Sequence, residues 1–167
     1  MAKLSPVAKL LRDLIALPSV NPAFLPDDPN HTGEERVALY LADLARKQGL
    51  EVSRQPVLPS RRNLLVRLKP SGKAKRRIIL SPHLDVVPAE DKQFKPRVKN
   101  GRLHGRGACD TKGSVAAFFH ALLELSKDRN RPAETEILFV GLVDEEHCQS
   151  GSRVLGERGP KGDLAIA

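Results

Sequence analysis

The apolar side chains of the first 50 residues recur at the three-to-four spacing of α-helices. One such run occupies residues 7–17 and should end at Pro18, because proline cannot continue a helix. Residues 17–29 then contain four prolines, which indicates an extended loop. Thr32 and Glu35 have the spacing of a capping box, so we expect a second helix there that ends at a glycine shortly before residue 50.

The middle of the chain changes to apolar runs that are typical of β-strands. Residues 51–58, 63–68 and 77–81 are predicted strands. The Pro-Ser-Gly turn between the last two predicts that they form an antiparallel pair. Residues 136–143 form a near-continuous apolar run, which indicates a strand that is covered on both faces.

The remaining apolar residues complete an alternation of helices and strands. We expect a third helix from about Thr111, a short helix over residues 150–158 and the opening of a buried strand at residues 164–167. This order predicts an α/β fold with a mixed, mostly parallel sheet and helices on both faces. In such sheets, functional side chains gather in the loops that follow the carboxyl ends of the strands. The segments at such positions are residues 82–88, 105–113 and 144–151.

The composition suits one globular domain. The chain has 167 residues, of which 40% are hydrophobic, enough to form a core and to exclude a disordered chain. No apolar run approaches the ~20 residues of a membrane span, and the first residues lack the apolar stretch of a signal peptide, so we expect no membrane partner. The two cysteines, Cys109 and Cys148, cannot form a disulfide framework and favour a cytoplasmic location.

The formal charge of +8 raises the question of a nucleic-acid partner. Basic residues cluster at Arg61, Arg62 and residues 69–77. Aromatic residues, however, make up only 4% of the chain, so stacking surfaces for bases are scarce. We therefore interpret residues 69–77 chiefly as a solvated turn and expect no nucleic-acid partner. A binding role for the basic surface remains an alternative.

The first strand-end segment carries His83 and Asp85. Residues two apart on an extended segment project to the same side. A metal-binding imidazole needs its other nitrogen fixed, and a carboxylate often does this. Taken alone the pair is a weak signal, and a structural or surface role is the alternative.

The second segment is rich in glycine and places Asp110 directly before the third helix. A helix N-terminus favours an ionised carboxylate there, because the free N–H groups and the dipole are positive. The alternative is an ordinary helix cap after a glycine turn. The spacing does not match a phosphate-binding loop.

The third segment places Asp144, Glu145 and Glu146 directly after a buried strand. Three consecutive acids at such a position are costly unless a cation lies among them. One carboxylate could then bind a metal ion while its neighbour accepts a proton from water. A solvated acidic turn is the alternative. Taken together, one imidazole and several carboxylates suit zinc, cobalt or manganese.

Three motifs in this order resemble a known family: SPHLDVVP at residues 81–88, GRLHGRGACDTKG at residues 101–113 and VDEEHCQSGS at residues 143–152. The family is that of zinc-dependent exopeptidases and deacylases, which includes acetylornithine deacetylase, succinyl-diaminopimelate desuccinylase, aminoacylase and glutamate carboxypeptidases. The early LPSVNP segment at residues 17–22 also fits. The resemblance implies a zinc-peptidase-like catalytic domain that hydrolyses an amide bond of an N-acyl amino acid or small peptide.

The resemblance also implies a role for each site residue. His83 would bind the first of two metal ions, with Asp85 orienting it from behind. Asp110 would bridge both ions, Glu146 would bind the second, and Glu145 would be the general base for a metal-bridged water. The ions would be Zn²⁺, two per complete site, with Co²⁺ or Mn²⁺ possible substitutes. A cis peptide bond after Asp110 is a further expectation.

Members of this family continue into a further Glu ligand, a late His ligand and a smaller dimerisation domain. We therefore expect residues 1–167 to be the N-terminal portion of a single catalytic domain, truncated at the C-terminus and inactive alone. The resemblance implies a homodimeric parent. Two alternatives stay open. One is a mononuclear metal hydrolase that uses His83, Asp110 and Glu146, and the other is an inactive fragment with only a binding role.

Overall fold

The computed structural model describes residues 4–167. Along the chain it contains α1 (Pro6–Ile15), α2 (Glu35–Lys47), β1 (Glu51–Leu58), β2 (Arg61–Leu68), β3 (Arg76–Leu80), the 3₁₀-helix η1 (Asp91–Phe94), β4 (Arg97–Lys99), β5 (Arg102–His104), α3 (Lys112–Lys127), β6 (Thr135–Gly141), α4 (Ser150–Arg158) and β7 (Leu164–Ile166). The predicted helices and the five strands of the main sheet are all present, with small shifts at their ends.

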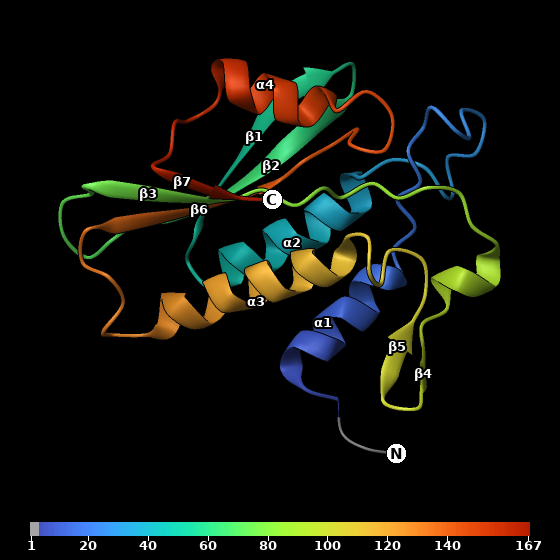
Figure 1. The fold of residues 1–167 in the computed structure, drawn as a ribbon, viewed down its shortest axis with the longest axis horizontal. Coiled ribbons are helices and arrows are strands. Elements are labelled where there is room, and N and C mark those ends of the chain that lie inside the picture. Colours follow the sequence, from blue (N-terminus) through green and yellow to red (C-terminus); the bar gives the residue numbers. More distant parts are fainter. Residues whose placement is uncertain (1–3) are drawn as a thin grey trace.

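The main sheet has the strand order β1-β2-β6-β3-β7. The pairs β1–β2 and β2–β6 are antiparallel, whereas β3 is parallel to both β6 and β7. Helices α1, α2 and α3 cover one face, and α4 lies on the other (Figure 1). The predicted mixed α/β sheet with helices on both faces is therefore confirmed.

The predicted antiparallel pairing of residues 63–68 with residues 77–81 is wrong. β6 lies between β2 and β3, and it is antiparallel to the first and parallel to the second. The apolar sequence of β6 agrees with this central position, where elements cover both faces of the sheet and bury nearly all its side chains. The Pro-Ser-Gly turn marks where the chain leaves β2 and does not determine which strand pairs with it.

The expected capping box at the start of the second helix is also wrong. Helix α2 begins at Glu35 with Glu34 at its N-cap, and no side chain caps it. The Thr32 hydroxyl instead donates to the backbone carbonyl of Asp28 at 2.8 Å. Glu34 is buried and its carboxylate has other partners, which belong to the site.

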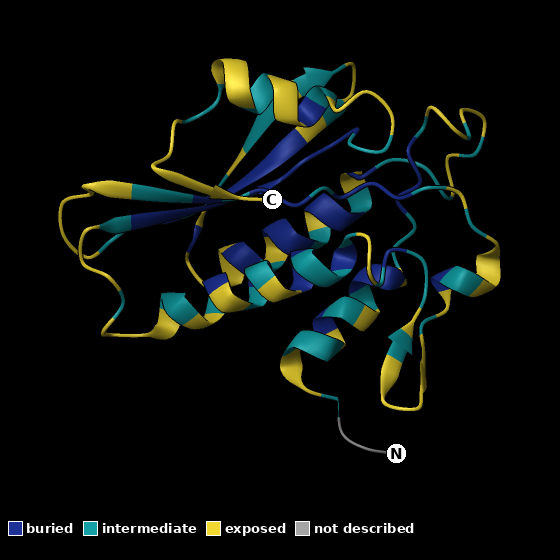
Figure 2. Cartoon of the chain, in the orientation of Figure 1, coloured by how far each residue is buried: buried dark blue, intermediate teal, exposed yellow. Residues whose placement is uncertain are grey.

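The core has one layer on each side of the sheet. On the side of α1, α2 and α3, residues such as Leu41, Phe119 and Phe139 form the larger cluster. On the side of α4, the smaller cluster includes Leu138 and Val140, with Leu155 of α4 packed against it. Figure 2 shows that buried residues concentrate at the centre, whereas β7 is exposed. Among the described residues, no helix has the length and apolar character needed to cross a bilayer.

A small hairpin, β4–β5, was not among the predicted elements. Its turn is Asn100–Gly101, and both residues have positive φ, 51° and 72°. An Asn-Gly pair is the strongest local signal for a two-residue hairpin turn, so the sequence did contain this information. The hairpin leads directly into the glycine-rich segment before α3 (Figure 1).

Candidate metal centre

Two of the three strand-end segments lie side by side. The chain after β3 continues alongside the chain after β6, with the Leu84 amide donating to the Leu142 carbonyl at 2.8 Å and a bridge between His83 and Leu142. Gly141 permits this approach, because a Cβ there would lie only 2.8 Å from a side-chain carbon of Leu84. The acidic segment that starts at Asp144 is therefore held next to His83.

The side chains of His83, Asp110 and Glu146 converge at this edge. Each offers one ligand atom, and these three atoms lie within 4.8 Å of one another. The Nε2 atom of His83 is 3.0 Å from Asp110 Oδ1 and 3.6 Å from Glu145 Oε2. The His83 side chain is 10% exposed and that of Asp110 is 75% exposed, so the group is open to solvent on one side. One imidazole and two carboxylates at this separation fit a divalent cation such as zinc.

The orientation of His83 leaves Nε2 free to face the carboxylates. Its Nδ1 is 3.0 Å from the Asp85 backbone carbonyl and 3.6 Å from the Asp85 carboxylate. Burial lowers the pKa of His83, but the Asp85, Glu145 and Asp110 carboxylates outweigh it and raise this pKa to about 9. The local field therefore strongly favours a positive charge at this position.

Asp85 connects two segments of the site. Its buried carboxylate accepts hydrogen bonds from the backbone amides of Glu145 and Glu146, each at 3.1 Å, and from Asn21 Nδ2 at 2.7 Å. Burial alone would raise the pKa of Asp85, but contact with His83 and these hydrogen bonds lower it. Asp85 thus stays ionised. Its carboxylate lies behind His83 and also fixes the backbone of Glu145 and Glu146.

The two glutamates differ in environment. Burial and the nearby Asp110 and Asp85 carboxylates raise the pKa of Glu146, although the charge of His83 opposes this. Glu145 is 37% exposed and lies beside the imidazole without joining the three-ligand group. One glutamate is therefore placed among the ligands and the other next to them, which allows a metal ligand and a proton acceptor to sit on adjacent residues.

A buried polar network supports this edge, and the motifs of the sequence indicated only one member, Asp144, but not Asn21, Glu34 or Arg61. Asn21 Nδ2 also donates to Asp144 at 3.1 Å, and Arg61 donates to the same oxygen at 3.0 Å. Arg61 donates further to Glu34 at 2.5 Å, and Glu34 accepts the Asp144 amide at 3.1 Å. Asp144 has a φ of 64°, a conformation that these contacts hold in place. A signal did exist for Asn21, which lies in the singled-out LPSVNP segment.

The peptide bond between Asp110 and Thr111 is cis, as the resemblance implied. Helix α3 begins one residue later with Lys112, which is 1% exposed. Its Nζ donates to the backbone carbonyls of Leu14 and Leu17 at 2.9 and 2.6 Å. Burial lowers the pKa of Lys112 to about 7. This lysine ties the segment that carries Asp110 to the end of α1.

A second group of possible ligand atoms comprises Asp144, His147 and Cys148. Cys148 Sγ lies 3.0 Å from His147 Nδ1. Both Asp144 oxygens, however, already accept hydrogen bonds, including one from Ser150 at 2.5 Å and one from Arg61. This group therefore fits a cation less well than the group that contains His83.

The fold and this arrangement are those of an α/β domain with a candidate metal centre at the edge of its sheet. A family model for Peptidase family M20/M25/M40 matches residues 79–166, which include all three strand-end segments. The chain belongs to this family.

Named relatives agree with this assignment. A succinyl-diaminopimelate desuccinylase from Methylobacterium nodulans is 34% identical over 152 residues, which cover 85% of this chain and 35% of that protein. An M20 family metallo-carboxypeptidase from Sulfolobus solfataricus has the same fold, with a TM-score of 0.78 at 20% identity over 98% of this chain and 37% of its own. A structure from Bacillus subtilis, described as a dinuclear metal binding peptidase, matches with a TM-score of 0.63 at 16% identity, covering 92% and 38%. The chain spans less than half the length of the curated relatives it matches.

Proposed function

We propose that this chain carries the metal-binding half of a hydrolase that cleaves an amide bond of an N-acyl amino acid or small peptide, using two divalent cations. The observation that carries the proposal is the convergence of His83, Asp110 and Glu146 at one sheet edge. The names of the relatives, a desuccinylase and a carboxypeptidase, support hydrolysis of this bond class.

Each residue has a proposed task. His83, Asp110 and Glu146 would hold the cations, and Asp110 is the ligand proposed to be shared by both. Divalent cations in such a site polarise a carbonyl oxygen and make a water molecule easier to deprotonate. Glu145 accepts the proton of the attacking water. Asp85 holds His83 and the backbone of the acidic segment in their positions relative to each other.

The remaining ligands and the substrate pocket would come from residues outside these 167, because the relatives are more than twice as long. Residues 1–167 are thus proposed to be the N-terminal portion of one catalytic domain, and the parent protein is proposed to assemble as a homodimer. Zn²⁺ is the proposed cation, with Co²⁺ or Mn²⁺ as substitutes. The two free cysteines favour the cytoplasm.

Calorimetric titration of the chain with Zn²⁺ tests the assignment of ligands. Glu146→Gln should weaken binding by about tenfold or more, because it removes a ligand charge. Glu145→Gln is the matched control, which removes the same charge one residue away and should have a much smaller effect. Equal effects of the two substitutions would refute the different roles proposed for them.

The histidine offers a second matched pair in the same titration. His83→Gln should abolish most Zn²⁺ binding, whereas His120→Gln, in α3, should bind like the unaltered chain. The metal content of the full-length parent separates the two alternatives, because two ions per site would support the dinuclear site and one ion would support the mononuclear alternative.

A further inference from the structure

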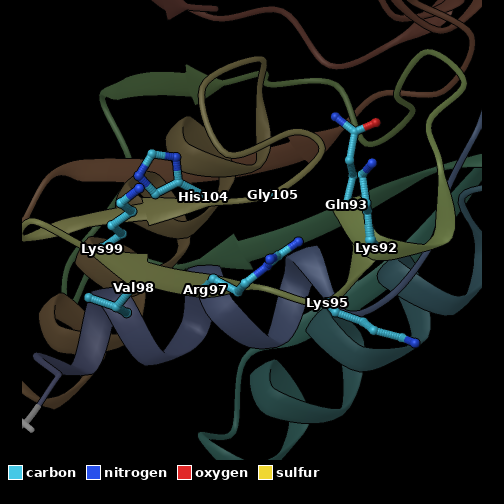
Figure 3. A pocket seen from close by; sticks show the side chains of 8 residues that line it. All are labelled: Lys92, Gln93, Lys95, Arg97, Val98, Lys99, His104 and Gly105. Carbon is cyan, nitrogen blue, oxygen red and sulfur yellow. The ribbon is translucent and has the colours of Figure 1, made fainter.

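A cavity of about 720 Å³ lies between η1 and the β4–β5 hairpin, away from the residues of the metal centre. Its lining includes Lys92, Lys95, Arg97 and Lys99, with His104 beside them, and contains no aspartate or glutamate (Figure 3). This volume is within the ~300–1,000 Å³ of small-molecule sites. The proposed amide hydrolysis makes no use of this cavity.

Among the described residues, most of the positive charge of this region has no ion-pair partner. Residues 92–109 contain six lysines or arginines and no acidic residue. Lys92 is paired with Glu90 at 2.6 Å, but within residues 4–167 no carboxylate lies within 4.0 Å of Lys95, Arg97 or Lys99. Several cations around one concave surface produce a positive potential that concentrates anions there.

The hairpin increases this potential at a cost in stability. In the β4–β5 register, Arg97 lies opposite His104 and Lys99 lies opposite Arg102. Side chains that are directly opposite share one face of the ribbon, and the like charges of Lys99 and Arg102 destabilise it. An anion bound at Lys99 would reduce this repulsion, because it would offset the positive charge of that side chain.

The polar groups are spread along the cavity and do not meet at a single point. Figure 3 shows Lys99 and His104 together at one end, Lys92 and Gln93 at the other, and Arg97 between them, whereas Lys95 points away. This spacing suits a ligand with several negative groups better than a single small ion. The lining has no aromatic side chain on which a nucleobase could stack.

The cavity wall is held by backbone contacts. The Arg106 amide donates to the Gln93 carbonyl at 2.8 Å, which joins η1 to the end of β5. The Gln93 side-chain oxygen accepts from the Glu90 amide at 3.2 Å, so its NH₂ group is left to donate to a ligand. Arg97 can bind a phosphate or carboxylate group with two parallel hydrogen bonds.

We propose that this cavity binds a small polyvalent anion, one that carries several phosphate or carboxylate groups. The wall residue Gly105 precedes Asp110 by only five residues, so the anion would sit at the base of the segment that leads to the metal centre.

Calorimetry with metal-free chain tests this, using sodium tripolyphosphate and citrate in separate titrations to distinguish phosphate from carboxylate ligands. We expect saturable binding of one anion per chain that weakens as salt increases. The double variant Arg97→Gln, Lys99→Gln should weaken binding by about tenfold or more, and it should fold at least as well because it removes like-charge pairing.

Two controls make the result specific. Lys73→Gln with Arg129→Gln removes the same charge from exposed positions elsewhere and should leave anion affinity nearly unchanged. His83→Gln should leave it unchanged as well, so failure of the metal centre and failure of the anion site are separate results. The proposal is overturned if neither anion binds, if both double variants weaken binding equally, or if a single-stranded oligonucleotide binds this surface more tightly than tripolyphosphate.

Discussion

At the scale of single residues, Asn21 is notable because one side-chain amide serves two buried carboxylates of the site. Its side-chain NH₂ group donates to Asp85 at 2.7 Å and to Asp144 at 3.1 Å, and all three residues are buried. Two ionised carboxylates on one donor group repel each other, so each needs further donors. Asp85 obtains them from the amides of Glu145 and Glu146, and Asp144 from Arg61.

Replacement of this amide should therefore affect both stability and metal binding. Asn21→Ala leaves two buried carboxylates short of a donor, which should lower the free energy of unfolding by about 1–3 kcal/mol. It should also weaken Zn²⁺ binding by about 10–100-fold, because Asp85 orients His83 and the acidic pair. Urea unfolding and calorimetry measure the two effects.

Asn130→Ala, at an exposed turn, is the control and should change neither quantity. Unchanged Zn²⁺ affinity in Asn21→Ala would show that Asp85 holds its position without this amide.

Part of this site could be predicted from the sequence, and the rest could not be predicted for a physical reason. His83 and Asp144 directly follow strands, so a rule about strand ends is enough to bring their segments together. Arg61 and Glu34 are 27 residues apart, and Arg61 meets Asp144 across 83 residues. Such contacts depend on which strands are neighbours, and local patterns do not encode this.

At the scale of elements, the hydrophobic periodicity predicted where strands and helices occur better than it predicted which strands pair. Residues 136–143 were predicted as a strand covered on both faces, and β6 is buried along nearly all its length. Its place between β2 and β3 could not be read from the turn signal, because competing pairings differ only in long-range packing. The β4–β5 hairpin is the opposite case, since its local Asn100–Gly101 signal was sufficient and was overlooked.

The junction of α1 and α3 depends on Lys112. Its Nζ donates to two carbonyls at the end of α1, those of Leu14 and Leu17, and the Leu14 carbonyl also accepts the Leu17 amide at 3.2 Å. Burial favours the neutral amine and lowers its pKa from 10.5 to about 7. Folding therefore releases a proton from this group between about pH 7 and 10.5.

Lys112→Met should remove this pH dependence. Between pH 7 and 9 the unfolded chain binds more protons at this position than the folded chain, so the stability of the unaltered chain should rise relative to the variant. The upper limit is about 1.4 kcal/mol per pH unit. Urea unfolding of both proteins at pH 6, 7, 8 and 9 measures the difference, which should be flat below pH 7. A difference that stays constant to pH 9 would contradict the lowered pKa.

At the scale of the whole molecule, the two edges of the sheet differ. The β1 edge carries charged residues that are paired, such as Arg54 with Glu35, and Pro56 interrupts its hydrogen-bonding groups. The β7 edge exposes Leu164 and Ile166, which are 53% and 41% exposed. Within residues 4–167, β7 pairs only with β3, so its outer backbone groups are available for another strand.

Because the β7 edge is unprotected, we expect copies of the chain to associate with one another as the protein concentration rises. An unprotected strand with apolar side chains pairs readily with a second strand, and a lysine on such an edge opposes pairing. Leu164→Lys should therefore shift the sedimentation profile of the chain toward monomer. Leu39→Lys is a matched control, because Leu39 is 52% exposed on α2 and receives the same charge away from the sheet edge. Sedimentation velocity over a wide concentration range would contradict the prediction if the unaltered chain stayed monomeric, or if both substitutions reduced association equally.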